Sequence, residues 1–292
     1  MVSNKIVKKF ILGSAQFGEK YGVNNPNASI SKKESLKILK FAKFSGINTI
    51  DLADKYKSYK KIFNTFKLSK WKVSMKISND EIKNITETKF NNFFFRNLDY
   101  LDKRKIDYFF FHNSSLLGNN KGKLIFDYLT RLKKEGFIGK IGVSVYDPKE
   151  FLNVLKNFHI DVVQLPLNIF DQRFCNSKYI KKINTKKIEV HARSIFLQGL
   201  LISDKEKLKK KYFKNNISLN RWFDYLKDNK KDAIVECLNF VLKKKFVSKI
   251  VFGVNKLDHL KSIMNKVKLN FNTEALDKFR THDITLIDPR KW

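Results

Sequence analysis

The sequence of 292 residues predicts a (β/α)₈ barrel, the TIM barrel, with parallel strands and a single domain over residues 1–292. Three observations predict this fold. Eight short runs rich in β-branched and aromatic residues recur along the chain, helical patterns separate them, and most of the runs are continuously apolar, as in a parallel sheet covered by helices. A doubly wound sheet is the alternative, but it generally has fewer strands, and no G-x-G-x-x-G motif follows the first run.

The predicted strands can be located one by one along the chain. They are residues 9–15 (KFILGSA), 48–53 (NTIDLA), 72–77 (KVSMKI), 107–112 (DYFFFH), 140–145 (KIGVSV), 162–167 (VVQLPL), 188–196 (IEVHARSIF) and 249–254 (KIVFGV).

Between the strands, two patterns predict where helices begin. Ser31 and Glu34 have the spacing of a capping box, and Asp147 followed by Pro148 is typical of an N-cap with proline at the first helical position. The longest interruption, residues 200–225, is expected to form a loop or insertion near the barrel mouth, or simply a long connection.

The net charge of +32 could indicate a nucleic-acid or anionic-membrane partner. Lysine, asparagine, isoleucine and phenylalanine are abundant together, however, and the basic residues are scattered among separate segments. Phe94, Phe95 and Phe109 to Phe111 lie in apolar runs that predict core rather than a base-stacking surface. We therefore expect no specific nucleic-acid partner and keep charge-driven binding as a weaker alternative.

Membrane, disulfide and metal functions find little support in the residue pattern. No run approaches the roughly 18 apolar residues that span a bilayer, and no cleavage pattern follows the basic N-terminus, so we expect a cytoplasmic protein without a membrane partner. Cys175 and Cys237 are too few for a disulfide framework or a thiolate cluster. His159, His191 and His282 lack partners at ligand spacing, so no metal site is predicted.

Polar side chains follow three neighbouring strands at the points where the strands end. Asp51 lies near the end of the second strand, Lys76 near the end of the third and His112 at the end of the fourth. Tyr56 follows the second strand, in a loop or first helical turn. Because a barrel forms its active site at the C-terminal ends of its strands, we expect these four side chains to converge.

Together these four residue types suit the reduction of a carbonyl group. A tyrosine has an unperturbed pKa of about 10, and the Lys76 ammonium would lower it by stabilising the phenolate. Asp51 can hold Lys76, and His112 can donate a hydrogen bond to a carbonyl oxygen beside Tyr56. The set predicts general-acid catalysis by Tyr56 with hydride from a cofactor. Taken singly, an aspartate after a strand is often a helix cap, a lysine is usually solvated, and a histidine after an apolar strand is often satisfied by the backbone.

With these residues the sequence resembles the aldo-keto reductase family. The D-x-A-x-x-Y pattern is present as Asp51, Ala53 and Tyr56, the lysine lies in VSMKI, and the histidine closes IDYFFFH. The resemblance runs from LGSAQFG through KIGVSV, VVQLPLNIFDQR and HARSIFLQGLL to IVFGVNKLDHL, and these blocks are most similar to a bacterial branch associated with sugar or surface-polysaccharide pathways.

The resemblance implies a nicotinamide cofactor, and two positions depart from the family pattern. Ser144 and Gln164 would hydrogen-bond the nicotinamide carboxamide. Alternatively, Gln164 hydrogen-bonds the backbone within the barrel and Ser144 simply ends a strand. Val145 replaces an asparagine, so one amide contact is missing. Arg193 replaces the aromatic residue that stacks on the nicotinamide, a role that a guanidinium plane can also fill.

The resemblance also implies which residues bind the rest of the cofactor. The loops after strands 7 and 8, with the N-terminus of the last barrel helix, would hold the phosphates, because free N–H groups and the helix dipole favour anions. Lys256 could pair with a 2′-phosphate, which favours NADPH and leaves NADH as the alternative. The expected cofactor contacts beyond the nicotinamide are Gly13, Ser194, Leu197, Gly199, Gly253, Asn255 and Lys256.

The main hypothesis is an NADPH-dependent oxidoreductase that reduces a small aldehyde or ketone to an alcohol. Sugar-derived carbonyls are one candidate class of substrate. The alternative is a catalytically quiet barrel that binds a dinucleotide as a sensor or scaffold. It is motivated by Val145, by Arg193 and by the stretch after Tyr56, where Lys57, Tyr59 and Lys60 replace a glycine-containing acidic stretch of the family. The C-terminal tail, with Asp283, Asp288 and Trp292, either closes the pocket or packs on the barrel. Substrate identity and oligomeric state stay open.

Overall fold

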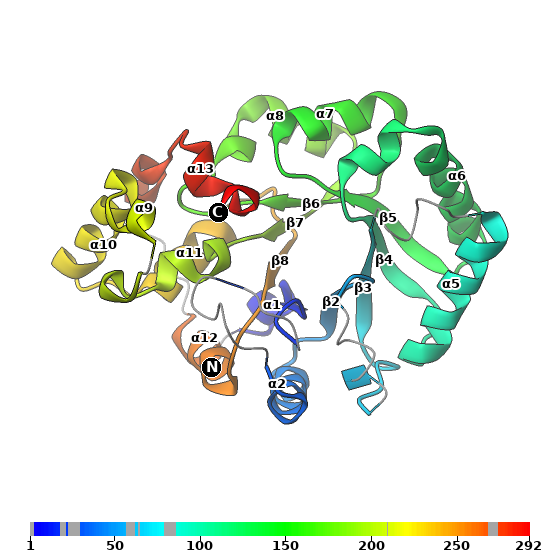
Figure 1. Ribbon diagram of the computed structural model, residues 1–292, viewed down its shortest axis with the longest axis horizontal. Helices are drawn as coiled ribbons and strands as arrows, with labels where there is room; N and C mark the ends of the chain where they lie inside the picture. Colours follow the sequence, from blue (N-terminus) through cyan, green and yellow to red (C-terminus); the bar gives the residue numbers. More distant parts are fainter. Residues whose placement is uncertain are drawn as a thin grey trace.

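In the computed structural model, eight parallel strands close into a barrel with helices around its outside (Figure 1). The strands follow one another in chain order, and β1 pairs with β8 to complete the ring. The prediction of a (β/α)₈ barrel is confirmed, and each of the eight predicted strands is present with its ends shifted by a few residues. The strands are β1 (Phe10–Gly13), β2 (Thr49–Ala53), β3 (Lys72–Ile77), β4 (Ile106–Phe111), β5 (Ile138–Ser144), β6 (Val162–Pro166), β7 (Glu189–Arg193) and β8 (Lys249–Phe252).

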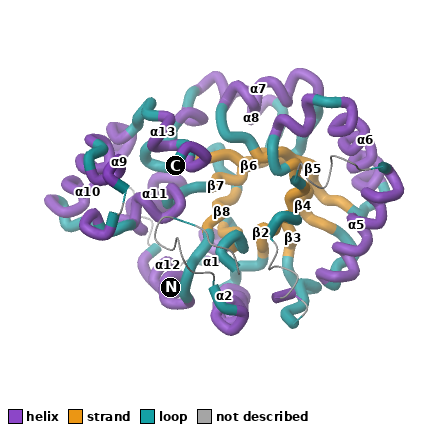
Figure 2. Tube along the Cα trace, viewed as in Figure 1, coloured by secondary structure: helices purple, strands orange, loops and turns teal. Residues whose placement is uncertain are grey.

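Helices form the outer layer of the barrel (Figure 2). The structure describes residues 3–17, 22, 30–56, 62–63, 65–78, 86–208, 210–267 and 274–292. In these ranges, no helix is both long enough and apolar enough to cross a bilayer. The α-helices are α1 (Asn4–Val7), α2 (Lys32–Phe44), α5 (Glu87–Leu101), α6 (Asn120–Lys134), α7 (Pro148–Asn157), α8 (Ser177–Thr185), α9 (Lys211–Lys214), α10 (Ile217–Asp228), α11 (Ala233–Leu242), α12 (Leu257–Lys266) and α13 (Ile284–Ile287). The 3₁₀ turns are η1 (Ser114–Gly118), η2 (Arg173–Cys175), η3 (Leu197–Ile202), η4 (Lys205–Lys207), η5 (Glu274–Phe279) and η6 (Pro289–Lys291).

Both predicted helix starts are confirmed. The Asp147 side chain accepts hydrogen bonds from the N–H groups of Lys149 and Glu150 at the start of α7, with Pro148 in the first turn. The Ser31 side chain accepts from the Glu34 N–H at 3.2 Å at the start of α2. In a capping box the glutamate side chain would return to the N-cap N–H. The Glu34 carboxylate instead accepts a hydrogen bond from the Leu257 N–H at the start of α12.

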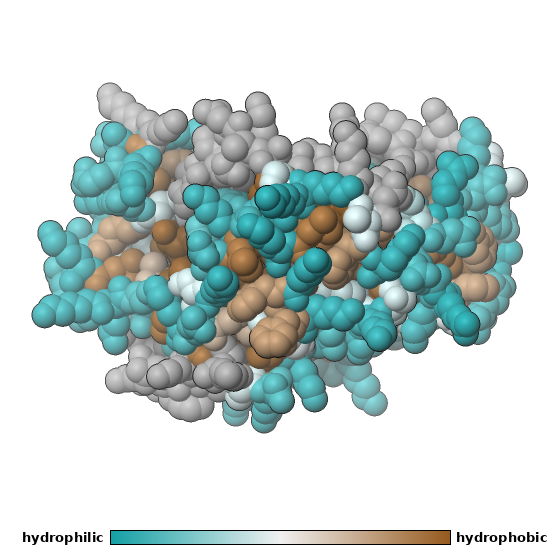
Figure 3. All heavy atoms as spheres, turned by 90° about the horizontal axis from the view of Figure 1, so that it is seen from below, coloured by the Kyte–Doolittle hydropathy of each residue, from teal (hydrophilic) through white to brown (hydrophobic). Residues whose placement is uncertain are grey.

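The apolar core includes buried residues from Ile6 to Ile287, nearly the whole length of the chain. Phe94 and Phe109 to Phe111 are buried as predicted, whereas Phe95 is 37% exposed at the outer side of α5, where it packs edge-on against Phe137. The core prediction was wrong for Phe95 because two adjacent helical positions cannot both face the barrel. On the face in Figure 3, hydrophilic residues cover most of the described surface and hydrophobic residues appear in the gaps between them.

The segment 200–225 contains the end of η3, all of η4 and α9, and most of α10, so it is not a plain loop. Trp222 of α10 is fully buried and donates its indole N–H to the Leu201 carbonyl at 2.9 Å. Its ring stacks on Tyr225 and meets Phe279 edge to face. An amphipathic helix with a tryptophan anchor explains the order in this segment.

A polar cluster lies inside the barrel toward the N-terminal ends of the strands. Glu189 of β7 accepts hydrogen bonds from the Tyr108 hydroxyl at 3.2 Å and the His191 ring at 2.9 Å, and it forms an ion pair with Lys140. Burial raises the pKa of Glu189, but the bonds from His191 and Lys140 outweigh burial and lower this pKa to about 2. The carboxylate therefore stabilises the barrel in its charged form.

Replacing Glu189 by glutamine should lower the free energy of unfolding at neutral pH by roughly 1.5–3 kcal/mol, because charge-assisted hydrogen bonds are lost. The folded-state pKa lies below the ordinary value of 4.5, so this stabilisation is present above that pH and is lost as the pH falls from 4.5 toward 2. Denaturant unfolding of wild type and Glu189→Gln across this pH range measures the difference.

Glu87→Gln is the control, because Glu87 pairs with Arg131 on the surface, where both side chains are about half exposed. It should change stability by less than about 0.5 kcal/mol at any of these pH values. A Glu189→Gln defect that persists unchanged near pH 2 would contradict the assignment.

Candidate active site

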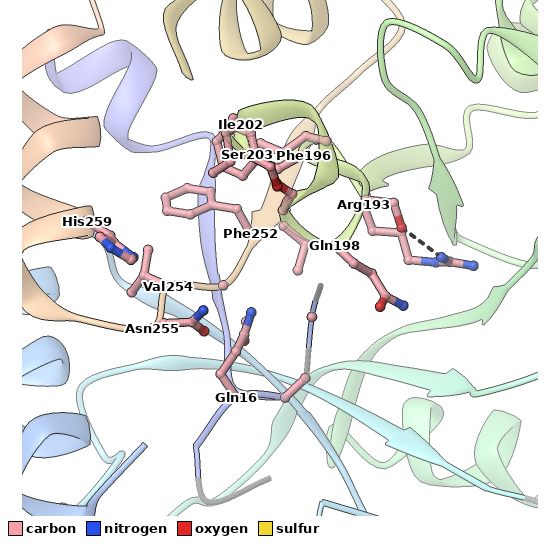
Figure 4. Close-up of a pocket in the computed structure, with 18 of the residues that line it drawn as sticks. Gln16, Arg193, Phe196, Gln198, Ile202, Ser203, Phe252, Val254, Asn255 and His259 are labelled. Atoms are coloured by element: carbon pink, nitrogen blue, oxygen red, sulfur yellow. Dashed lines mark hydrogen bonds between the residues drawn. The ribbon is translucent and has the colours of Figure 1, made fainter. Parts of the chain in front are cut away.

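A cavity of about 2030 Å³ opens where the strands end (Figure 4). Every strand contributes to its wall, either with a residue of its own or with the residue that follows directly. These residues are Gly13, Asp51, Lys76, His112, Ser144, Gln164, Arg193 and Phe252, in strand order.

A buried ion pair joins Asp51 of β2 to Lys76 of β3. Asp51 lies opposite Ser74 in the sheet register, and Lys76 comes two residues later, so all three side chains point to the interior. Asp51 also accepts hydrogen bonds from the Ser74 hydroxyl at 2.7 Å and the Gln164 amide at 3.1 Å. Burial lowers the pKa of Lys76, and the Asp51 carboxylate opposes this shift.

Tyr56 and His112 lie beside this pair. The two rings meet edge to face with their centroids 6.3 Å apart, and the Lys76 ammonium is 6.0 Å from the Tyr56 ring centre. Burial, with the nearby charges of Lys76, Lys55 and Arg193, lowers the pKa of His112 to about 2. The imidazole is therefore neutral at physiological pH, and the structure brings the four predicted catalytic side chains together.

Ser144 and Gln164 are neighbours across β5 and β6, and both are buried in the cavity wall. The Arg193 guanidinium, at the end of β7, donates to the Val145 carbonyl at 3.0 Å and to the Ser194 hydroxyl at 3.2 Å. The two departures from the family pattern, Val145 and Arg193, are therefore in direct contact.

Tyr146 is a cavity residue that sequence reasoning missed. The Arg193 guanidinium lies 4.2 Å from its ring centre, and the Arg290 guanidinium lies 3.6 Å from it. Arg290 belongs to the C-terminal tail and is bound by Asp288. Cation–π contacts therefore connect β7, the loop after β5 and the tail at one side of the cavity.

The C-terminal tail also meets the segment 200–225. Trp292 lines the cavity and packs edge-on against Phe213 of α9 with centroids 5.1 Å apart. Asp283 accepts hydrogen bonds from the Tyr212 hydroxyl at 2.6 Å and the Asn216 amide at 3.0 Å. The tail both packs on the barrel and, through Trp292, contributes to the cavity wall.

The loop after β7 has a strained backbone. Ser194, Leu197 and Gln198 have positive φ values of 58°, 47° and 53°, and Gly199 follows at 93°. Such conformations cluster at functional sites in proteins. Ser194 and Gly199 line the cavity, whereas Leu197 is fully buried in the core and its N–H donates to the Ser194 carbonyl, so the structure does not bring Leu197 to the cavity.

Gly253, Asn255 and Lys256 line the cavity where β8 leads into α12. The first N–H of α12, that of Leu257, is not free, because it donates to the Glu34 carboxylate at 2.7 Å. His259, in the first turn of α12, also lines this part of the cavity. In the part of the chain that the structure describes, no group of three or more His, Cys, Asp or Glu side chains could hold a metal ion.

Comparison with known proteins decides the family. The sequence profile of the aldo/keto reductase family matches residues 9–284. The chain belongs to the aldo-keto reductase family. A search of the curated proteins gave no match.

Solved structures support the fold. The holo form of an aldo-keto reductase from Bacillus halodurans has a TM-score of 0.72 at 16% identity and covers 93% of this chain and 90% of its own. A glycerol dehydrogenase from Gluconobacter oxydans has a TM-score of 0.69 at 18% identity, with coverage of 96% and 92%. Family membership implies an oxidoreductase that reduces carbonyl groups with NAD(P)H.

Some residues of this aldo-keto reductase site were missed for identifiable reasons. Ser74 could have been found, because it shares the inward face of β3 with Lys76. Tyr146 could have been found in the same way, because it comes two residues after Ser144 and so is expected on the same face. Glu34 gave none, since its role depends on a helix that lies more than 200 residues away in sequence. Lys57, Tyr59 and Lys60 lie outside the described residues.

Replacing Asp51 by asparagine should lower the free energy of unfolding by about 3–5 kcal/mol, because the Lys76 ammonium would be left buried without its counter-ion. The loss should be larger near pH 6 than near pH 9, since Lys76, whose pKa burial lowers, can lose its proton at higher pH. Urea denaturation at both pH values measures the change.

Asp224→Asn serves as the control, because Asp224 and Lys205 form a solvent-exposed pair with 3.9 Å between charged atoms. This variant should lose less than about 0.5 kcal/mol. Equal losses in the two variants would show that the buried Asp51–Lys76 pair contributes no more to the free energy of unfolding than an exposed pair does.

Proposed function

We propose that this aldo-keto reductase reduces an aldehyde or ketone, with sugar-derived carbonyls as the first class to test, and that Tyr56 supplies the proton. The observation that carries the proposal is the grouping of Tyr56, His112 and the ion-paired Lys76 in one wall of a large cavity. A buried ammonium beside a tyrosine favours the phenolate that forms when the proton leaves.

Each side chain has a separate task in this reaction. Neutral His112 hydrogen-bonds the carbonyl oxygen and positions it beside Tyr56. Tyr56 gives its phenolic proton to that oxygen, and Lys76 stabilises the phenolate left behind. Asp51 holds Lys76 in place with the help of Ser74. The carbonyl carbon gains a hydride and the oxygen gains a proton, so the product is an alcohol.

The cavity suits a nicotinamide dinucleotide, NADPH or NADH, which supplies the hydride when bound. Its volume of about 2030 Å³ exceeds the roughly 300–1,000 Å³ of ordinary small-molecule sites, which leaves room for cofactor and substrate together. Among the described residues, three buried polar atoms in its wall lack a hydrogen-bond partner, namely His112 Nδ1, Arg193 Nε and Asn255 Oδ1. Ser144, Gln164, Ser194 and Gly199 are the further residues proposed to hold the cofactor.

A second candidate is a barrel that binds a dinucleotide without catalysis. It is favoured by Arg193, whose guanidinium is held by Val145 and Tyr146 where the family has an aromatic residue. Tight cofactor binding without carbonyl-dependent oxidation of NADH or NADPH would support it.

Tyr56→Phe should lower kcat for carbonyl reduction by about 10²–10⁴-fold, because the general acid is removed while the cavity shape is kept. Cofactor affinity should stay within about twofold. The measurement is the loss of reduced-cofactor absorbance with a panel of aldehydes, ketones and sugar-derived carbonyls, together with a fluorescence titration of the cofactor.

The matched control is Tyr179→Phe, because Tyr179 on α8 packs against Phe174 and is not a wall residue of this cavity. It should keep wild-type turnover. Unchanged turnover in Tyr56→Phe would rule out the assigned proton donor.

A further inference from the structure

Glu34 places a fixed negative charge at the N-terminus of α12. Its Oε1 atom accepts the Leu257 N–H at 2.7 Å, and its side chain is only 28% exposed. The two helices lie side by side in Figure 1, although they are far apart in the chain. A sequence pattern that predicts a local capping box thus produces a contact between helices.

The sequence at the start of α12 explains why this carboxylate is needed there. The described helices of nine or more residues are otherwise capped by the side chain of the preceding residue, whereas the N-cap of α12 is Lys256, which makes no such bond. Lysine has no side-chain oxygen to accept a helix N–H. Glu34 supplies the missing acceptor and complements the positive end of the helix dipole.

This carboxylate lies on the α12 side of the cavity, across the barrel mouth from His112. Tyr56 and His112 are near the ends of β2 and β4, whereas α12 follows β8, which is opposite β4 in the eight-stranded ring. In Figure 4, Arg193 lies on one side of the cavity and Asn255 and His259 on the other. Ile30, Ser31, Ile263 and Glu34 complete this second side.

The proposed function determines how a dinucleotide would lie in this cavity. With its nicotinamide beside Tyr56 and His112, its adenosine would extend across the barrel mouth to the side of the cavity that Glu34, Asn255 and Lys256 line. NADPH differs from NADH only by a 2′-phosphate on the adenosine ribose, a group with a charge of about −1.5 to −2 at neutral pH. A carboxylate accepts hydrogen bonds from ribose hydroxyls and repels that phosphate.

The nearby cations are less well placed than the carboxylate. Lys37 is 53% exposed and lies 3.9 Å from the second carboxylate oxygen, and Lys256 is exposed. Flexible, hydrated ammonium groups hold an anion weakly. The Leu257 N–H, which could otherwise bind a phosphate, is already bonded to Glu34.

We propose that Glu34 makes this enzyme prefer NADH over NADPH. This inference rests on the proposed function and reverses the preference that Lys256 alone suggests. Glu34 is a specificity-determining residue that discriminates by the negative charge it places between α2 and α12.

The test is a fluorescence titration of wild type and Glu34→Gln with NADH and with NADPH. Wild type should bind NADH at least about tenfold more tightly than NADPH. Glu34→Gln should reduce this ratio by about tenfold or more, mainly through tighter NADPH binding. The wild-type ratio should also fall as salt is added, because ions screen the repulsion.

Two further variants separate the effect of the Glu34 charge from the effect of its hydrogen bond to Leu257. Glu206→Gln is the matched control, because it removes another carboxylate of the cavity wall and should leave the ratio unchanged. Leu257→Pro removes the donated N–H but keeps the Glu34 charge, and proline is tolerated at the first position of a helix. It should retain the NADH preference, which a purely structural role of the contact would not predict.

Tighter binding of NADPH to wild type, or an unchanged ratio in Glu34→Gln, would overturn the inference while leaving the proposed reductase intact. Failure of wild type to bind either cofactor would overturn the proposed function and this inference together.

Discussion

The buried ion pair between Lys76 and Asp51 is the interaction on which the rest of the site depends. A charged ammonium is stable inside a barrel only when a carboxylate lies against it, and that carboxylate needs donors of its own. Ser74 and Gln164 provide them, from β3 and β6. The pair therefore ties three strands together and fixes the place where Tyr56 and His112 meet.

The same charge explains the state of the histidine. His112 is buried near Lys76, Lys55 and Arg193, and their positive charges add to the effect of burial in keeping the ring neutral. In the proposed reaction, the neutral ring would hydrogen-bond the carbonyl oxygen and leave Tyr56 as the proton donor. The charges around His112 thus support the separate roles proposed for these two residues.

The departures from the family pattern make physical sense as a group. With valine at position 145, no side-chain amide extends from the end of β5, and the Val145 carbonyl accepts the Arg193 guanidinium instead. That guanidinium also packs on Tyr146, whose ring contacts Arg290 of the C-terminal tail. Through Tyr146, Arg193 at the end of β7 is thus linked to the C-terminal tail, whose last residue, Trp292, lines the cavity.

The sequence by itself determined the barrel, its eight strands and the meeting of Asp51, Tyr56, Lys76 and His112, because apolar periodicity sets the strands and a parallel barrel brings their ends together. Only the tertiary structure decided where side chains with a clear local pattern make their contacts. Glu34 has the spacing of a capping box, yet it caps α12, and Phe95 is in an apolar run, yet it faces outward. The physical reason is that hydrogen bonds and burial depend on distances between elements, and periodicity in one segment contains no information about the segment that packs against it.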